Sequence, residues 1–324
     1  MKYRTLTGTG AKVSRLCLGT MTFGAQTDEA ESIRIVHRAL EAGICFVDTA
    51  DAYTNGVSET ITGKALAGGL REGVVLASKV RNPVGPYEHK DVGLTRWHII
   101  HGVEASLKRL GTDCLDIVYL HQPDYNTPLE ETMAAADHLV RQGKAMYIGM
   151  SNYAAWQVCQ ALWVCDRNRL APPVVTQVVY NLVTRGIEQE YLPFCRELGL
   201  GVTVYNPLAG GLLTGKHRRQ SAPTEGTRFQ LAPMYYDRYW RDSHFEALEQ
   251  LLAIAREAGK TPVALALQWL AAQQTVDAII LGVSRMEHLE DNLSAWDGEL
   301  SADVLQACDR VWGQIRGDSF QYNR

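Results

Sequence analysis

Asp48, Lys79 and His121 each stand at the end of an apolar run of the sequence. Burying a carboxylate, an ammonium or an imidazole costs free energy unless the groups pair with one another. If the three side chains lie together, they form an acid–base set that can hold and move a proton. Each residue alone could instead cap a helix, face solvent at a strand end or be a hydrogen-bonded core residue, so their convergence is what points to function.

The apolar runs predict the strands of a parallel sheet. They are short, rich in β-branched residues and continuous, as in strands buried on both faces. Most are spaced by roughly 30 residues, the length of one βα unit. The expected strands are 15–19, 44–48, 74–79, 115–121, 145–151, 174–179, 201–205 and 278–281. Eight such units predict an α/β fold, the (β/α)8 TIM barrel.

Helix signals lie between these runs. A helix is expected over 29–42, ending at Gly43, and another runs from an N-cap at Thr95 to a stop at Gly111. Pro128 is expected in the first turn of a third helix, where its missing N–H is tolerated.

Two segments depart from the βα repeat. Residues 3–6 and 12–14 flank Gly8-Thr9-Gly10 and predict an N-terminal β-hairpin that closes the bottom of the barrel. Between the seventh and eighth strands, an irregular stretch at 216–241 precedes two extra helices. Long loops of this kind are usually functional or disordered. We expect a single domain over residues 1–324.

Composition narrows the class of protein. The 324 residues are 46% hydrophobic and 21% charged, with a net charge of -4, which is ordinary for a globular protein and argues against nucleic acid or an anionic membrane as partner. The N-terminus has no apolar signal region and no stretch reaches ~20 apolar residues. We therefore expect a cytoplasmic protein.

Metal and disulfide chemistry are not expected. The seven cysteines are scattered, with no C-x-x-C pair. His98 and His101 lie one helical turn apart, a spacing that could bind metal, but no third ligand accompanies them.

Barrel enzymes carry their active sites at the carboxyl ends of the strands. In this sequence those ends carry Thr20, Asp48, Lys79, His121, Ser151, Asn152, Gln177, Tyr205, Asn206 and the 282–284 segment.

Several ordered motifs at these ends resemble the aldo-keto reductase family. They are the segments 16–21, 48–53 (Asp-Thr-Ala-Asp-Ala-Tyr), 77–79, 119–124, 149–152 and 282–292. The resemblance covers nearly the whole chain and is closest to the bacterial and potassium-channel β-subunit-like branch, whose cofactor motif is Gly-x-Ser. A series of motifs in register is far more specific than any one of them.

The resemblance implies reversible, NADPH-dependent reduction of an aldehyde or ketone to an alcohol. Tyr53 would be the general acid, and its pKa near 10 would have to be offset by the ammonium of Lys79. Asp48 would keep that lysine charged and oriented. His121 would position the carbonyl oxygen and assist proton transfer. Tyr53 and His121 would contact the substrate. Apart from the resemblance, we also expect Phe23 to contact it.

The resemblance also implies an extended nicotinamide dinucleotide, and no Rossmann fingerprint competes with this prediction. Ser151, Asn152 and Gln177 would bind the carboxamide, and Tyr205 would stack on the nicotinamide ring. The full set of expected cofactor residues is Thr20, Met21, Asp48, Ser151, Asn152, Gln177, Tyr205, Asn206, Pro207, Leu208, Gly210, Lys216, Arg228, Gly282, Ser284, Arg285, His288, Asp291 and Asn292.

His288 and Asp291 depart from the branch, which usually has Gln and Glu at these positions. The helix start after Ser284 can still receive a 2′-phosphate, so we expect NADP(H) in preference to NADH.

Two other functions are considered. The same fold can serve as an NADPH-binding, redox-sensing regulatory subunit with little turnover. A barrel glycosidase would need two carboxylates flanking a sugar site, and only Asp48 and Asp51, in one loop, are apparent. The sequence leaves open the substrate, the preferred direction, the formation of a homo-oligomer and the role of the aromatic loop 234–240.

Overall fold

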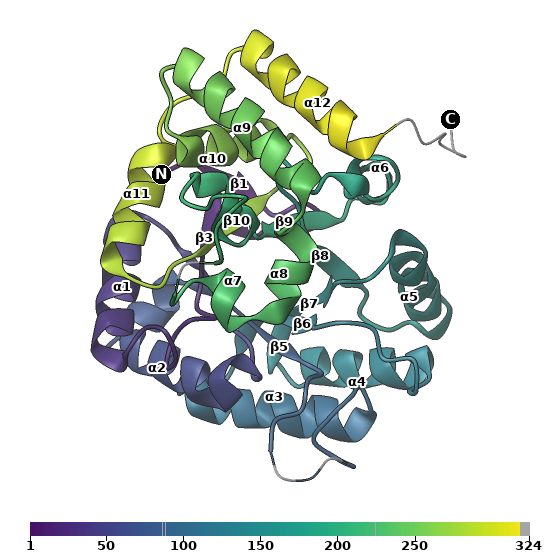
Figure 1. Cartoon of the computed structure of the whole chain (residues 1–324). Helices are drawn as coiled ribbons and strands as arrows, with labels where there is room; N and C mark the ends of the chain where they lie inside the picture. The colour runs from purple at the N-terminus through teal and green to yellow at the C-terminus, as the bar shows by residue number, and fades with distance from the viewer. Residues whose placement is uncertain (86, 88, 224, 318–324) are drawn as a thin grey trace. The chain divides into compact units, whose positions relative to one another are not determined.

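A closed barrel of eight parallel strands forms the centre of the fold (Figure 1). In this computed structural model, which describes residues 1–85, 87, 89–223 and 225–317, the strands follow the order β10-β3-β4-β5-β6-β7-β8-β9. Their bounds are β3 (Leu16–Gly19), β4 (Phe46–Asp48), β5 (Val75–Val80), β6 (Leu115–Leu120), β7 (Ala145–Ser151), β8 (Pro173–Val179), β9 (Gly201–Tyr205) and β10 (Ala278–Gly282). The predicted barrel is confirmed, with several strand ends moved by one or two residues.

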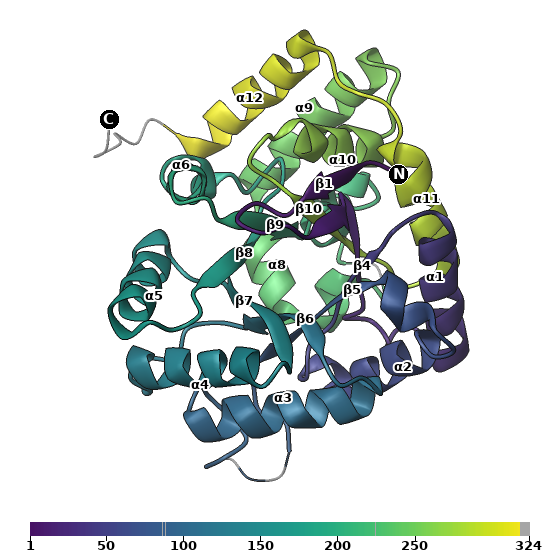
Figure 2. The ribbon, with the colours of Figure 1, turned by 180° about the vertical axis from the view of Figure 1, so that it is seen from behind.

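Helices follow the strands and pack against one another in sequence order from α1 to α5 (Figure 2). They are α1 (Glu29–Glu41), α2 (Val57–Ala65), α3 (Arg96–Leu110), α4 (Leu129–Arg141), α5 (Ala155–Asn168) and α6 (Tyr191–Glu197), with short 3-10 turns at η1 (Tyr53–Gly56), η2 (Leu70–Gly73) and η3 (Gly186–Glu188). The Thr95 side chain accepts a hydrogen bond from the His98 N–H, and Gly111 ends α3 with a φ of 64°, both as predicted. Pro128 is the N-cap of α4 rather than part of its first turn.

The N-terminal hairpin is also confirmed. Strand β1 (Tyr3–Thr5) pairs antiparallel with β2 (Lys12–Ser14). Leu6 and Val13 are fully buried in one cluster with side chains of the barrel strands. Thr7 Oγ1 donates to Asp277 Oδ1 over 3.0 Å, just before β10 begins. The hairpin therefore packs at the amino-terminal end of the strands, opposite the end that carries the candidate site.

The chain divides into two compact units. The barrel unit comprises residues 1–178, 188–205 and 275–289, and the helical unit comprises 179–187, 206–274 and 290–324, of which the last seven residues lie outside the described part. The helical unit contains η4 (Ala209–Thr214), α7 (Arg228–Leu231), α8 (Pro233–Tyr239), α9 (Asp242–Glu257), α10 (Pro262–Ala272) and α12 (Ala302–Arg316), and α11 (Met286–Trp296) begins in the barrel unit and ends in the helical one. A single domain over 1–324 stays a prediction.

The stretch 216–241 is less irregular than expected, because it contains α7 and α8. The rings of Phe229 and Trp240 meet edge to face with centroids 5.2 Å apart, and His217 packs against both. Aromatic contacts of this kind stabilise short helices that local propensity alone would not predict. The two expected helices after this stretch, α9 and α10, are confirmed.

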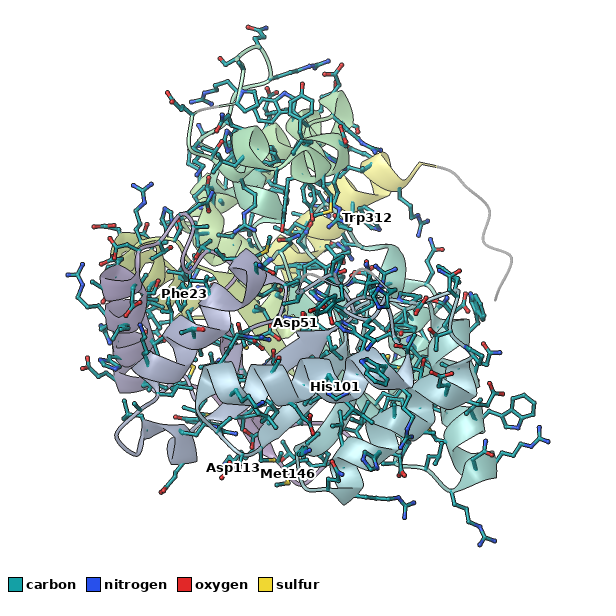
Figure 3. The ribbon with its side chains drawn as sticks, turned by 90° about the horizontal axis from the view of Figure 1, so that it is seen from below. Phe23, Asp51, His101, Asp113, Met146 and Trp312 are labelled. Atoms are coloured by element: carbon teal, nitrogen blue, oxygen red, sulfur yellow. The ribbon has the colours of Figure 1, made fainter. Side chains whose placement is uncertain are left out.

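Other features bear on the class of protein. All seven cysteines have free thiols. Within the described residues, no helix combines the length and the apolar character needed to span a bilayer. His98 is buried in α3. His101 is exposed on the same helix (Figure 3), and its Nδ1 lies 3.6 Å from Glu104 Oε2. Among these residues, no cluster of three or more metal-ligating side chains occurs.

Candidate active site

Lys79 lies at the centre of the candidate site. Its Nζ donates hydrogen bonds to Asp48 Oδ1, to the Thr49 carbonyl oxygen at 2.8 Å and to the Tyr53 hydroxyl oxygen at 3.0 Å. An ammonium group has three N–H donors, and these three acceptors use them all. Because Lys79 is 2% exposed, water cannot compete for these bonds. The Lys79 side chain is therefore fixed in one position beneath the phenol.

The charge on Lys79 is also stabilised. Burial alone would lower the pKa of this ammonium, but the charge of Asp48 and the Tyr53 oxygen outweigh that effect, so the pKa is raised above its usual value. The second oxygen of Asp48 accepts a hydrogen bond from Gln177 Nε2 over 2.8 Å. Asp48 thereby links the lysine on β5 to the end of β8.

Tyr53 begins the 3-10 turn η1, which directly follows the loop after β4. The next two residues, Thr54 and Asn55, have φ of 50° and 52°, a left-handed conformation that non-glycine residues rarely adopt. Thr54 Oγ1 donates to the Phe23 carbonyl oxygen over 2.9 Å, which anchors the turn. Such local strain is typical of functional sites. In this turn, the centroid of the Tyr53 ring lies 4.7 Å from Lys79 Nζ.

His121 follows β6 and faces Tyr53, with ring centroids 6.0 Å apart at an interplanar angle of 78°. Burial, with the nearby charges of Lys79 and Arg81, lowers the pKa of His121 to about 3. The imidazole is therefore neutral near pH 7. A neutral ring can orient a carbonyl oxygen by a hydrogen bond, but it has no extra proton to give, so the low pKa of His121 fits the positioning part of its predicted role.

The residues predicted to bind the nicotinamide carboxamide lie together at the ends of β7, β8 and β9. Ser151 Oγ donates to the Gln177 carbonyl oxygen at 3.0 Å, and Asn152 Nδ2 donates to Ser151 Oγ at 3.1 Å. The Tyr205 hydroxyl donates to Asn152 Oδ1 at 2.7 Å. Asn152 has a φ of 64°. The structure thus joins this group to Lys79 through Gln177 and Asp48.

Three further predicted residues, Thr20, Met21 and Phe23, follow β3, and they differ in how exposed they are. Thr20 is buried, and its Oγ1 lies 2.9 Å from Ser58 Oγ, so its side chain is engaged within the fold. Met21 is 42% exposed. Phe23 is fully buried, so it is not part of the exposed surface at the site. Its predicted contact with substrate stays a prediction.

The segment predicted to hold the 2′-phosphate surrounds the start of α11. Gly282 and Arg285 are exposed, and Ser284 Oγ lies 3.2 Å from His288 Nδ1. The Met286 N–H, however, donates to Glu31 Oε1 over 2.8 Å. A carboxylate that the sequence did not reveal therefore occupies the first turn of this helix.

In the helical unit, Tyr235 connects two predicted cofactor residues. Its hydroxyl lies 3.3 Å from an Arg228 guanidinium nitrogen and 3.4 Å from Asn206 Oδ1. Asn206 Nδ2 is buried and has no partner within the residues described. Lys216 lies beside Gly211, while Asn292 is buried and Asp291 is exposed. The remaining predicted residues of this unit are Pro207, Leu208 and Gly210.

Sequence reasoning missed several side chains that support the site. Gly149 leaves room for the Tyr119 ring, since a Cβ there would lie 2.4 Å from that ring. Asn82 contacts both His121 and Gln122 through its side chain. Asn82 lies only three residues after Lys79, just beyond the end of a strand. That position is the signal in the sequence by which it could have been predicted as a site residue.

The chain is similar to known proteins over most of its length. The family model described as "Aldo/keto reductase family" matches residues 15–313. The chain is 38% identical to "Uncharacterized oxidoreductase YrpG" of Bacillus subtilis (strain 168) over 98% of each protein. It is 37% identical to "Probable voltage-gated potassium channel subunit beta" of Arabidopsis thaliana, covering 92% of each. It is also 37% identical to "Aflatoxin B1 aldehyde reductase member 2" of Mus musculus, covering 95% of this chain and 87% of the relative.

The chain is an oxidoreductase built on a parallel eight-stranded barrel, and it holds Lys79 against Asp48 and Tyr53 near the carboxyl ends of the strands. The chain belongs to the aldo/keto reductase family.

Proposed function

We propose that the protein reduces an aldehyde or ketone to the alcohol, reversibly, with NADPH as hydride donor and Tyr53 as general acid. The observation that carries this proposal is the Lys79 ammonium, held between Asp48 and the Tyr53 hydroxyl. The aldehyde reductases among the relatives support the substrate class.

The residues of the chain can perform the proton transfer. Bound NADPH would supply a hydride to the carbonyl carbon, and negative charge then develops on the oxygen. Tyr53 would donate its proton to that oxygen, and the Lys79 ammonium would stabilise the phenolate left behind. Asp48 keeps the ammonium charged and oriented. In the reverse direction, the phenolate would accept the proton of the alcohol.

The cofactor would be held by the residues predicted from the sequence. Asn206 Nδ2 is buried and has no partner among the described residues, so it is a donor for which a bound ligand would provide an acceptor. Amide and hydroxyl groups of Ser151, Asn152 and Gln177 match the hydrogen-bonding groups of a carboxamide. Arg285, with Lys216 and Arg228, would meet the phosphates. NADPH is proposed as the preferred cofactor.

The test is turnover of 4-nitrobenzaldehyde with NADPH. Tyr53→Phe removes the proton donor and should lower kcat by about 10²- to 10⁴-fold, the contribution of a positioned general acid. Tyr125→Phe is the matched control because Tyr125 is 82% exposed. Equal activity of wild type and Tyr53→Phe would refute the acid role.

The relative described as a probable potassium channel subunit beta favours a second candidate, an NADPH-binding regulatory subunit with weak turnover. Tight NADPH binding without reduction across a screen of carbonyls would support this candidate. We further propose a single cytoplasmic domain over 1–324 that acts on a small molecule. Assembly into a homo-oligomer can be measured by light scattering.

A further inference from the structure

We infer that Asn82 is a positioning residue that holds His121 in the tautomer with its hydrogen on Nε2. In that tautomer, Nε2–H donates a hydrogen bond to the substrate oxygen. The inference deepens the proposed function, because it rests on His121 meeting the carbonyl group. Neither the comparisons nor the sequence motifs assign a role to Asn82.

The side-chain contacts of Asn82 orient its amide. Asn82 follows β5 by two residues, and its Nδ2 lies 3.2 Å from His121 Nδ1. On the other side, Gln122 Nε2 donates to Asn82 Oδ1 over 2.9 Å. Because the Asn82 oxygen is engaged by this donor, its NH2 group is the part that faces the imidazole. An amide NH2 can only donate, so His121 Nδ1 must accept.

A neutral imidazole carries one hydrogen, and the contact with Asn82 excludes it from Nδ1. The low pKa of His121 means that the neutral ring prevails near pH 7. The hydrogen therefore lies on Nε2. The backbone of His121 is fixed as well, since its N–H donates to the Val80 carbonyl oxygen at 3.0 Å and its carbonyl oxygen accepts from Asn152 Nδ2 at 2.9 Å.

The tautomer matters because of the charge that develops on the substrate oxygen. With the hydrogen on Nε2, that oxygen receives a hydrogen bond from His121 in addition to the proton of Tyr53. Donors fixed in advance around a developing oxyanion stabilise the transition state. The opposite tautomer would turn a nitrogen lone pair toward the same negative oxygen. Asn82 and Gln122 would thus act on the reaction through His121 without touching the substrate.

The first measurement is independent of turnover. Long-range 1H–15N NMR spectra of protein labelled with 15N-histidine distinguish a protonated ring nitrogen from an unprotonated one, and His121→Gln identifies the signals of His121. We expect protonated Nε2 and unprotonated Nδ1 in the wild type. A hydrogen on Nδ1 would overturn the inference even if the protein reduces carbonyls. The same spectra decide the tautomer if no carbonyl is reduced, so failure of the proposed function is separately visible.

The second measurement uses Asn82→Asp, which replaces the donor with an acceptor of the same shape. The carboxylate should draw the hydrogen to Nδ1 and raise the pKa of His121 against the opposing charges of Lys79 and Arg81. We expect kcat at pH 8 to fall about 10- to 100-fold, while KM for NADPH is unchanged. Activity should recover as pH falls through the raised pKa, because the doubly protonated ring again carries a hydrogen on Nε2.

Two further variants complete the test. Asn126→Asp adds the same charge at an exposed residue that does not contact His121, and it should leave kcat and its pH profile unchanged. Asn82→Leu provides no donor, so its spectra should show a mixture of tautomers. If Asn82→Asp retains wild-type kcat and pH profile while its spectra show hydrogen on Nδ1, the tautomer has no catalytic effect and the inference fails.

Discussion

Lys79 and Asp48 form an ion pair whose side chains are almost wholly buried. Removing one partner of such a pair strands the other charge, so Lys79→Met should lower the free energy of unfolding by about 3–5 kcal/mol. The double variant Lys79→Met/Asp48→Asn should lose less than the sum of the two single changes, as urea unfolding would measure. Lys64→Met is the control, since Lys64 pairs with Glu29 at the surface and should cost under about 1 kcal/mol. Additive losses would contradict this account of the pair.

Asp51 is a buried carboxyl group two residues before Tyr53, and neither of its side-chain oxygens has a partner in the described part of the chain. Burial, and then the charge of Glu59, raise the pKa of Asp51 well above its usual value. Its proton is therefore retained in the folded state and lost in the unfolded state above about pH 4. Asp51 consequently makes the fold less stable as pH rises from there, by at most about 1.4 kcal/mol per pH unit.

Asp51→Asn should remove this dependence, because an amide does not titrate. The variant should be more stable than the wild type at pH 8, and the difference should shrink toward pH 4. Urea unfolding at several pH values measures both effects. Asp113→Asn, at a residue with an exposed carboxylate, should leave the slope unchanged. An identical slope in Asp51→Asn and wild type would show that Asp51 ionises in the folded protein.

At the scale of elements, the strands were predictable because burial on both faces gives continuous apolar runs. The bounds of β7 and β9 agree with the prediction, whereas β4 begins at Phe46 rather than Ile44. Ile44 is buried before strand pairing begins, and an apolar pattern reports burial rather than hydrogen bonding. Helices α7 and α8 were missed because they depend on ring contacts such as that of Phe229 with Trp240.

The candidate catalytic residues could be placed together for a related reason. Strand ends converge in any barrel, so Asp48, Lys79 and His121 could be placed at one end from the pattern of strands and the family motifs. The contact between Asn82 and His121 could not be predicted in this way. The two residues are 39 positions apart, and their contact depends on how the Asn82 amide group is oriented. The position of Glu31 against Met286, 255 residues away, was equally hidden.

The hairpin gives a prediction about an element. Leu6 is fully buried in the cluster that joins the hairpin to the barrel. Leu6→Ala should lower the free energy of unfolding by about 2–5 kcal/mol, because it removes buried methyl groups and leaves a cavity. Lys12→Ala, at an exposed position of the same hairpin, should change it by under about 0.5 kcal/mol. Equal urea midpoints for both variants would mean that the hairpin does not stabilise the barrel.

For the whole molecule, cofactor binding and stability are linked. A ligand that binds only the folded chain stabilises it by about 2.7 kcal/mol at a hundredfold excess over its Kd. The rise in Tm therefore ranks cofactors even before a substrate is known. If NADP+ is preferred, it should raise Tm more than NAD+ does at equal concentration, and Arg285→Ala should reduce that difference.

Glu31 gives a second prediction about the proposed preference for NADP(H). Its carboxylate accepts from the Met286 N–H at the start of α11, beside the residues proposed to receive the 2′-phosphate. A negative charge there opposes a second anion, and charges at a helix N-terminus contribute about 0.3–1 kcal/mol.

Glu31→Gln keeps the shape of the side chain and should tighten NADP+ binding by about two- to fivefold. NAD+, which has no 2′-phosphate, should bind as before. Glu29 lies exposed on α1, the helix that also carries Glu31, so Glu29→Gln should change the binding of neither cofactor. Fluorescence titration measures the Kd of both cofactors. If Glu31→Gln tightens the binding of NAD+ and NADP+ equally, Glu31 does not act on the 2′-phosphate.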